Sequence, residues 1–147
     1  MISTVLIIGA NDVGKTNLIH ALRILLDRGI SDYDVELKES DFFAFEENTE
    51  VIIHAYFEDV TEGCVVGRLG EYISDDNKMV VQYTATLKDG KVDYLYYIGR
   101  SDDKNDLQPK ENAFYRKYIN LKYISSRRDF WGYINKTKKP VADTSQG

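Results

Sequence analysis

The sequence has 147 residues, of which 43% are hydrophobic and 29% charged, a balance typical of one globular domain and not of a disordered or fibrous chain. Its single cysteine, Cys64, excludes an internal disulfide and a cysteine-based zinc cluster, and its apolar runs are too short to span a bilayer, so we expect a cytoplasmic protein without a membrane partner. The net charge of −5 is unevenly distributed. Residues 1–109 have 10 basic and 21 acidic side chains, a net charge of −11, whereas residues 110–147 have 9 basic and 3 acidic side chains, a net charge of +6.

The first 50 residues predict a strand, a helix and a loop, in that order. Residues 3–8 are β-branched and apolar without alternation, which indicates a strand buried on both faces. From Thr16 to Arg28 apolar residues recur at helical spacing, and Gly29 is a plausible end for that helix. Residues 30–50 are acidic and poor in apolar side chains, so we expect a loop with short turns.

The middle of the chain predicts an antiparallel sheet. Apolar residues alternate over 51–57 and again over 79–87, and a tyrosine-rich run follows at 92–98. Asp89-Gly90 between the last two runs is a strong signal for a hairpin.

Shorter elements are expected around this sheet. Residues 68–73 predict one or two helical turns, residues 112–119 a short helix, and residues 121–124 another strand. We also expect Cys64 to be a small buried or half-buried residue. The chain is therefore expected to be one α/β unit: a strand, loop and helix over 1–29, an antiparallel β insertion over 50–100, and a basic C-terminal segment over 110–147.

One motif carries recognisable chemistry, and it lies between the first predicted strand and the first predicted helix. It matches the phosphate-loop pattern G-x-x-x-x-G-K-[ST] at every fixed position, through Gly9, Ala10, Asn11, Asp12, Val13, Gly14, Lys15 and Thr16. In such a loop the backbone N–H groups surround a phosphate, Lys15 contacts the β- and γ-phosphates, and the Thr16 hydroxyl is the ligand for Mg²⁺. We therefore expect a nucleotide with Mg²⁺ at this loop.

The motif does not identify the reaction. The base-specific segment of GTPases is not matched, because Asn135-Lys136-Thr137-Lys138 has lysine where aspartate is needed. A small self-contained kinase remains an alternative, with Arg127 and Arg128 as phosphate clamps. Glu58-Asp59 follows an apolar strand, as a metal-binding carboxylate would, but the alternation in that strand predicts partial exposure and argues against this role.

The stretch GANDVGKTNLIHALRILLD, residues 9–27, resembles the ABC-type ATPase heads of RecF and SMC proteins, where asparagine is usual at the positions of Asn11 and Asn17. It resembles still more the OLD family of ATP-dependent endonucleases, which includes the large subunit of the Gabija anti-phage system. Further weak similarities follow in the same order, at residues 39–42, 51–59 and 123–129.

This resemblance implies the first half of an ABC-ATPase head, binding ATP through residues 9–17, with Asn17 included. It also implies a full protein that regulates a DNA nuclease in DNA processing or anti-phage defence, with a head-to-head homodimer and DNA or a helicase as partners. Only eight residues precede Gly9, and the ABC signature, the acidic strand end and the Toprim nuclease centre are not recognisable. The expected lobe is thus incomplete, with no catalytic residue of its own and little ATP turnover alone.

A third alternative is a non-catalytic module whose basic end binds nucleic acid or an acidic partner. Tyr94, Tyr96 and Tyr97 could stack on nucleic-acid bases, but we expect these rings to lie on half-exposed sheet faces. His20 and His54 are expected to face solvent, and they do not form a metal site or a catalytic pair.

Overall fold

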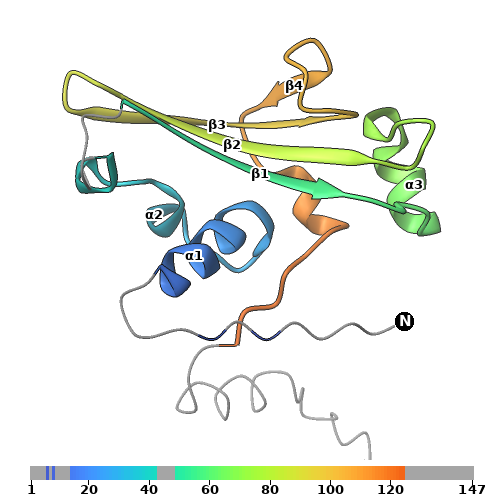
Figure 1. Ribbon diagram of the computed structural model, residues 1–147, viewed down its shortest axis with the longest axis horizontal. Helices are drawn as coiled ribbons and strands as arrows, with labels where there is room; N and C mark the ends of the chain where they lie inside the picture. The colour runs from blue at the N-terminus through green and yellow to red at the C-terminus, as the bar shows by residue number, and fades with distance from the viewer. Residues whose placement is uncertain (1–5, 7, 9–13, 43–48, 125–147) are drawn as a thin grey trace, which may run out of the picture.

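A four-stranded antiparallel sheet with helices packed on one of its faces forms the framework of the computed structural model (Figure 1). The structure describes residues 6, 8, 14–42 and 49–124. The strand expected at residues 3–8 lies outside these residues except for Leu6 and Ile8, both of which are exposed.

Helix α1, Lys15–Leu26, confirms the helix predicted over 16–28 but ends two residues earlier. The chain turns at Asp27, whose backbone is extended and whose buried carboxylate accepts hydrogen bonds from Arg23 Nε (2.9 Å) and the Gly29 N–H (2.8 Å). Burial in α1 is confined to its last turn, at Ile24 and Leu25. Three apolar side chains that precede them in the helix are 37–44% exposed: Leu18, Ile19 and Leu22.

The acidic stretch after α1 forms short turns, as expected. Helix α2, Asp32–Val35, is capped by the Ser31 hydroxyl, which accepts a hydrogen bond from the Asp34 N–H. The 3₁₀ helix η1, Glu39–Phe42, follows and buries Phe42.

The strands β1 (Glu50–Phe57), β2 (Met79–Lys88), β3 (Lys91–Gly99) and β4 (Leu107–Lys110) lie in the order of the sequence, each antiparallel to its neighbour. The predicted hairpin is confirmed: Asp89 and Gly90 both have positive φ, which matches the twist of the strands that they join. Residues on the inner face of β2 are buried against α1, α2 and η1, and they include Val81, Tyr83 and Ala85.

Two elements of the sheet region differ from expectation. Strand β4 lies in a polar segment that predicted no strand, because its four residues carry little apolar pattern and include Pro109, which only an edge strand tolerates. The strand predicted over 121–124 is wrong: this segment runs without regular structure, and Leu121 donates one backbone hydrogen bond to Leu26 O (2.8 Å).

The remaining helices are α3 (Gly63–Leu69) and the 3₁₀ turns η2 (Gly70–Tyr72) and η3 (Phe114–Lys117). Helix α3 begins five residues before the turns predicted from Arg68. The expectation for Cys64 is wrong, since it is exposed: α3 directs Val65 and Leu69 into the core, and Cys64 lies on another side of this short helix.

A substitution at Gly99 tests the close backbone contact between β3 and the loop before β4. A Cβ atom at this position would lie 2.1 Å from Asp106 O and 2.7 Å from its carbonyl carbon, both of which are backbone atoms. We expect Gly99→Ala to lower the free energy of unfolding by about 1–3 kcal/mol, because the backbone must move to admit the methyl group. Urea unfolding followed by circular dichroism measures this loss.

The matched control is Gly67→Ala in α3, where an added Cβ meets nothing within 4 Å. Alanine in a helix is favoured over glycine by about 0.5–1 kcal/mol, so this variant should be more stable than the parent chain. Equal stability of the two variants would contradict the close approach at Gly99.

Candidate functional site

The described part of the phosphate-loop motif is the start of α1. Gly14 has φ +89° and ψ 3°, a left-handed conformation that L side chains rarely adopt, and its carbonyl accepts the first helical hydrogen bond, from the Leu18 N–H (3.0 Å). Glycine is thus required by the backbone at the residue that precedes Lys15. The first five loop residues, 9–13, lie outside the described residues, so the structure gives no contacts for them.

The chemistry at this end of α1 suits an anion. The side chains of Thr16 and Asn17 are exposed and that of Lys15 is half-buried. No side chain caps the helix among the described residues, and no acidic residue occurs in its first turn. The first N–H groups of a helix have no partner within the helix, and together with the helix dipole they favour a bound negative charge. The residues present therefore fit a phosphate group with a metal ion beside it.

The opposite end of α1 is held by three side chains that we call the carbonyl clamp: Tyr96, Tyr115 and Arg116. The hydroxyl of Tyr115 donates to Leu25 O (2.8 Å), and that of Tyr96 donates to Ile24 O (3.2 Å). Arg116 donates through Nε to Leu25 O (3.2 Å) and through Nη2 to Ile24 O and to the Tyr96 hydroxyl oxygen (2.6 Å). Carbonyls that the helix itself leaves unpaired are satisfied in this way.

Burial changes the acidity of the clamp. It raises the pKa of Tyr96 to about 12, although the neighbouring Arg116 guanidinium acts in the opposite direction. Burial also raises the pKa of Tyr115 above its ordinary value near 10. Both phenols therefore keep their protons, and remain donors to α1, throughout the physiological range.

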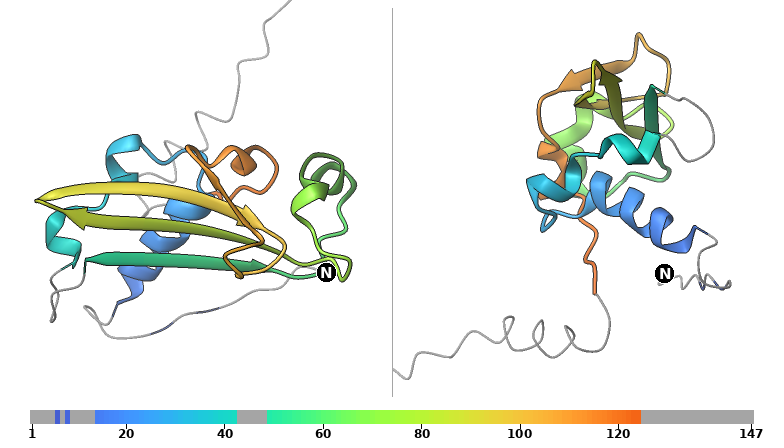
Figure 2. Two further views of the ribbon diagram at one scale, coloured as in Figure 1. Left: turned by 90° about the horizontal axis from the view of Figure 1, so that it is seen from above. Right: turned by 90° about the vertical axis from the view of Figure 1, so that its left-hand side faces the viewer.

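The same end of α1 has further contacts with the segment after η3. The Arg23 guanidinium lies over the ring of Tyr123, 4.2 Å from its centroid, and Leu121 bonds to the last carbonyl of the helix. In Figure 2, right, this end of α1 lies under the sheet while its N-terminal end projects away. The sheet and the C-terminal segment thus fix the end of α1 that is remote from the phosphate-loop motif.

Sequence reasoning missed the clamp. The half-exposed position expected for Tyr96 is wrong, because this side chain is only 3% exposed and its hydroxyl bonds to α1, which also leaves no exposed ring for base stacking. Tyr94 and Tyr97 are half-buried. A signal was present: Tyr96 alternates with Ile98 on the apolar face of its strand, and a tyrosine buried there requires a partner for its hydroxyl.

Other candidate residues stay apart from the motif. Glu58 and Asp59 are exposed after a strand whose exposure alternates, as expected. His54 is exposed and bonds to Gln82 Oε1 (2.7 Å), whereas His20 is half-buried with Nε2 at 3.0 Å from Asp34 O, so the expectation of a solvent-facing His20 holds only in part. Within the described ranges, no three His, Cys, Asp or Glu residues are grouped so as to hold a metal ion.

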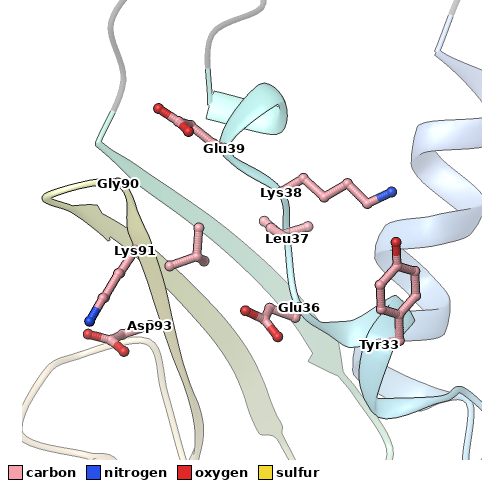
Figure 3. A pocket seen from close by; sticks show the side chains of 9 residues that line it. Tyr33, Glu36, Leu37, Lys38, Glu39, Gly90, Lys91 and Asp93 are labelled. Atoms are coloured by element: carbon pink, nitrogen blue, oxygen red, sulfur yellow. The ribbon is translucent and has the colours of Figure 1, made fainter.

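A hollow of about 620 Å³ lies between the α2–η1 connection and the β2–β3 turn (Figure 3). Leu37 lies at its centre, and its rim alternates acidic and basic side chains, such as Glu36, Lys38, Lys91 and Asp93. None of the residues predicted to bind nucleotide lines this hollow. Its mixed charge gives no preference for an anion, so it is not the phosphate site.

Removal of one clamp hydroxyl should weaken the fold. We expect Tyr115→Phe to lower the free energy of unfolding by about 1 kcal/mol at pH 7, since one hydrogen bond to a buried carbonyl is lost while Arg116 still donates to the same atom. The control is Tyr33→Phe, at a ring that is 72% exposed, which should change stability by less than about 0.5 kcal/mol. Urea unfolding of the parent chain and the two variants measures these changes. Equal losses of stability in Tyr115→Phe and Tyr33→Phe would contradict the clamp.

Alkaline pH should destabilise the fold through Tyr96. In the unfolded chain this phenol ionises near pH 10, whereas in the folded protein it holds its proton until about pH 12. The folded state then binds more protons than the unfolded state, so stability falls as pH rises between these values, by up to about 1.4 kcal/mol per pH unit. Unfolding measured at pH 9, 10 and 11 should show a shallower fall for Tyr96→Phe than for Tyr33→Phe. Identical slopes would contradict a protonated Tyr96.

A comparison with known protein families identifies the family to which the chain belongs. A family model described as "AAA domain, putative AbiEii toxin, Type IV TA system" matches residues 5–123, well over half of the sequence. No curated protein and no solved structure matches. Across the described residues, no helix has the length and apolar character needed to cross a membrane. The matched range contains the phosphate-loop motif, α1, the sheet and the clamp, and the chain belongs to this family of AAA-type P-loop ATPase domains.

Proposed function

We propose that this domain binds ATP with Mg²⁺ at the start of α1. The observation that carries the proposal is the left-handed Gly14 at the head of a helix that no described side chain caps, directly before Lys15 and Thr16. Membership of an AAA-type ATPase family also supports it, since such domains typically use ATP and Mg²⁺.

The proposed roles follow from the chemistry of each group. Backbone N–H groups of residues 9–17 bind the phosphate oxygens, with Asn11 and Asn17 inside the same stretch. The Lys15 ammonium contacts the β- and γ-phosphates, and the Thr16 hydroxyl is a ligand of the metal ion. Mg²⁺ neutralises charge on the phosphates when it is bound.

We further propose that residues 1–147 act as one lobe of an ABC-type head resembling that of OLD nucleases. In this proposal hydrolysis requires a second lobe and two heads that enclose ATP between them. The complete protein would act in the cytoplasm and regulate a DNA nuclease in DNA processing or anti-phage defence, with DNA or a helicase as partner. The support is the run of residues 9–27 together with the family match.

The alternatives gain no support from the described residues. The arginines expected to serve a kinase, Arg127 and Arg128, lie outside them. Part of the basic C-terminal segment has structural roles, since Arg116 bonds to α1 and Lys110 lies over the rings of Tyr72 and Phe114. These contacts account for two of its positive charges without an acidic partner.

Calorimetric titration of the 147-residue protein with ATP and Mg²⁺ tests the site. We expect Lys15→Ala to weaken binding at least about tenfold, because a charge-assisted contact to phosphate is worth roughly 1.5–3 kcal/mol. The matched control is Lys88→Ala, at an exposed lysine at the end of β2, which should bind ATP as the parent chain does. Equal affinities of all three proteins would refute the proposed site.

A measurement of ATP hydrolysis tests the proposed incomplete head separately from the proposed ATP-binding site. Steady hydrolysis of ATP by this chain alone would refute the requirement for a second lobe and leave the binding site intact. Transfer of phosphate to a nucleoside or sugar would instead favour the kinase.

A further inference from the structure

The side of β1 that faces away from β2, which we call the open edge, has no strand beside it among the described residues. Figure 2, left, shows β1 as the outermost strand at one margin of the sheet. Proteins usually protect such edges with proline, lysine or a very short strand. The opposite edge follows this rule, because β4 has four residues including Pro109. Strand β1 has eight residues with no proline, lysine or arginine.

The register shows which backbone groups the open edge presents. The Leu87 N–H donates to Thr49 O (2.8 Å), so residues 49 and 87 form a hydrogen-bonded pair of the β1–β2 ladder. Bonded and non-bonded pairs alternate in an antiparallel ladder, so residues 51, 53, 55 and 57 bond to β2. The N–H and C=O groups of the other four residues therefore point to the open edge: Glu50, Ile52, His54 and Tyr56.

The apolar row on the inner face of the sheet is incomplete at this edge. On β2 the inner residues Met79, Val81 and Tyr83 are 0% exposed. Directly opposite on β1, residues 51, 53, 55 and 57 are apolar but only half-buried. Both sets of residues lie on the inner face of the sheet. Among the described residues, β2 has a strand on each side, whereas β1 has a strand on one side only. Another strand on the open edge would cover this row.

We propose that the open edge pairs with β1 of a second copy of the chain, antiparallel about a two-fold axis at Ile53, to form one continuous eight-stranded sheet. This register matches every edge-facing group with another: Glu50 pairs with Tyr56 of the second copy, and Ile52 pairs with His54 of the second copy. Glu50 is the one Asp, Glu, Lys or Arg in β1, and it lies opposite Tyr56 of the second copy, so no like charges lie directly opposite each other. On the inner face, Ile53 lies against Ile53 of the second copy.

This interface is separate from the proposed ATP site and does not depend on it. The start of α1 carries the phosphate-loop motif, whereas the open edge belongs to the sheet. A two-fold sheet of this kind is also different from the head-to-head arrangement implied by the resemblance, in which ATP lies between the two copies.

Sedimentation equilibrium of the full 147-residue chain, from about 1 µM to 1 mM, tests the pairing. We expect a concentration-dependent dimer that Ile52→Pro weakens at least tenfold. The N–H of residue 52 faces the open edge, so proline there removes no bond to β2 but blocks a second strand. The matched control is Ile52→Thr, which keeps the N–H and should still dimerise. A monomer at every concentration, or unchanged dimerisation of Ile52→Pro, would overturn the proposal.

Cysteine cross-linking tests the register without proline and uses a Cys64→Ser background. In the proposed register Ile53→Cys places two thiols opposite each other in a non-hydrogen-bonded pair, whereas Ile52→Cys places each thiol opposite His54 of the second copy. We expect mild oxidation to give several-fold more covalent dimer from Ile53→Cys, although Ile52 is the more exposed residue. Equal or faster cross-linking of Ile52→Cys would overturn the two-fold axis at Ile53.

Hydrogen exchange separates a second copy from a strand of the same chain. In the dilute monomer the amides of residues 50, 52, 54 and 56 should exchange quickly and become protected as the dimer forms. Protection that is already complete in the monomer would mean that the chain itself covers the open edge, and the proposal would fail.

Discussion

The carbonyl clamp is the interaction on which the arrangement of this domain depends. A helix end packed against a protein core has carbonyl groups that neither water nor the helix can satisfy, and each would cost about 1–3 kcal/mol if left without a donor. Tyr96, Tyr115 and Arg116 supply these donors at the end of α1. Their hydrogen bonds fix the helix to β3 and η3, so the element that begins with Gly14 has a defined position relative to the sheet.

The parts of the fold that could be predicted are those specified by neighbouring residues. Asp89-Gly90 requires a tight turn, the alternation over 51–57 requires a half-exposed strand, and the spacing in 16–28 requires a helix; each element is present. Strand β4 could not be predicted because its pairing with β3 is stabilised by backbone contacts, including the close approach at Gly99. The apolar residues at 121–124 suggested a strand, yet this segment packs at the end of α1 instead.

The candidate site also has a part that the sequence predicts and a part that it does not. The phosphate-loop motif is contiguous, so pattern and spacing identify Gly14, Lys15 and Thr16 from the sequence alone. The clamp joins residues more than 70 positions apart, and a tyrosine or an arginine has many ordinary roles. Only the position of Tyr96 on the apolar face of a strand indicated a buried hydroxyl in need of a partner. The sequence therefore predicts the groups that meet a ligand better than those that hold them in place.

The clamp also has a consequence for the order of folding during synthesis. Tyr115 and Leu25 are separated by 90 residues, so α1 leaves the ribosome long before its anchor exists. At about 5–20 residues per second this interval lasts roughly 5–20 s. Until then the carbonyl groups of Ile24 and Leu25 lack part of the set of donors that they have in the folded domain. Helix α1, which begins directly after Gly14, is therefore synthesised early and acquires its full set of contacts late.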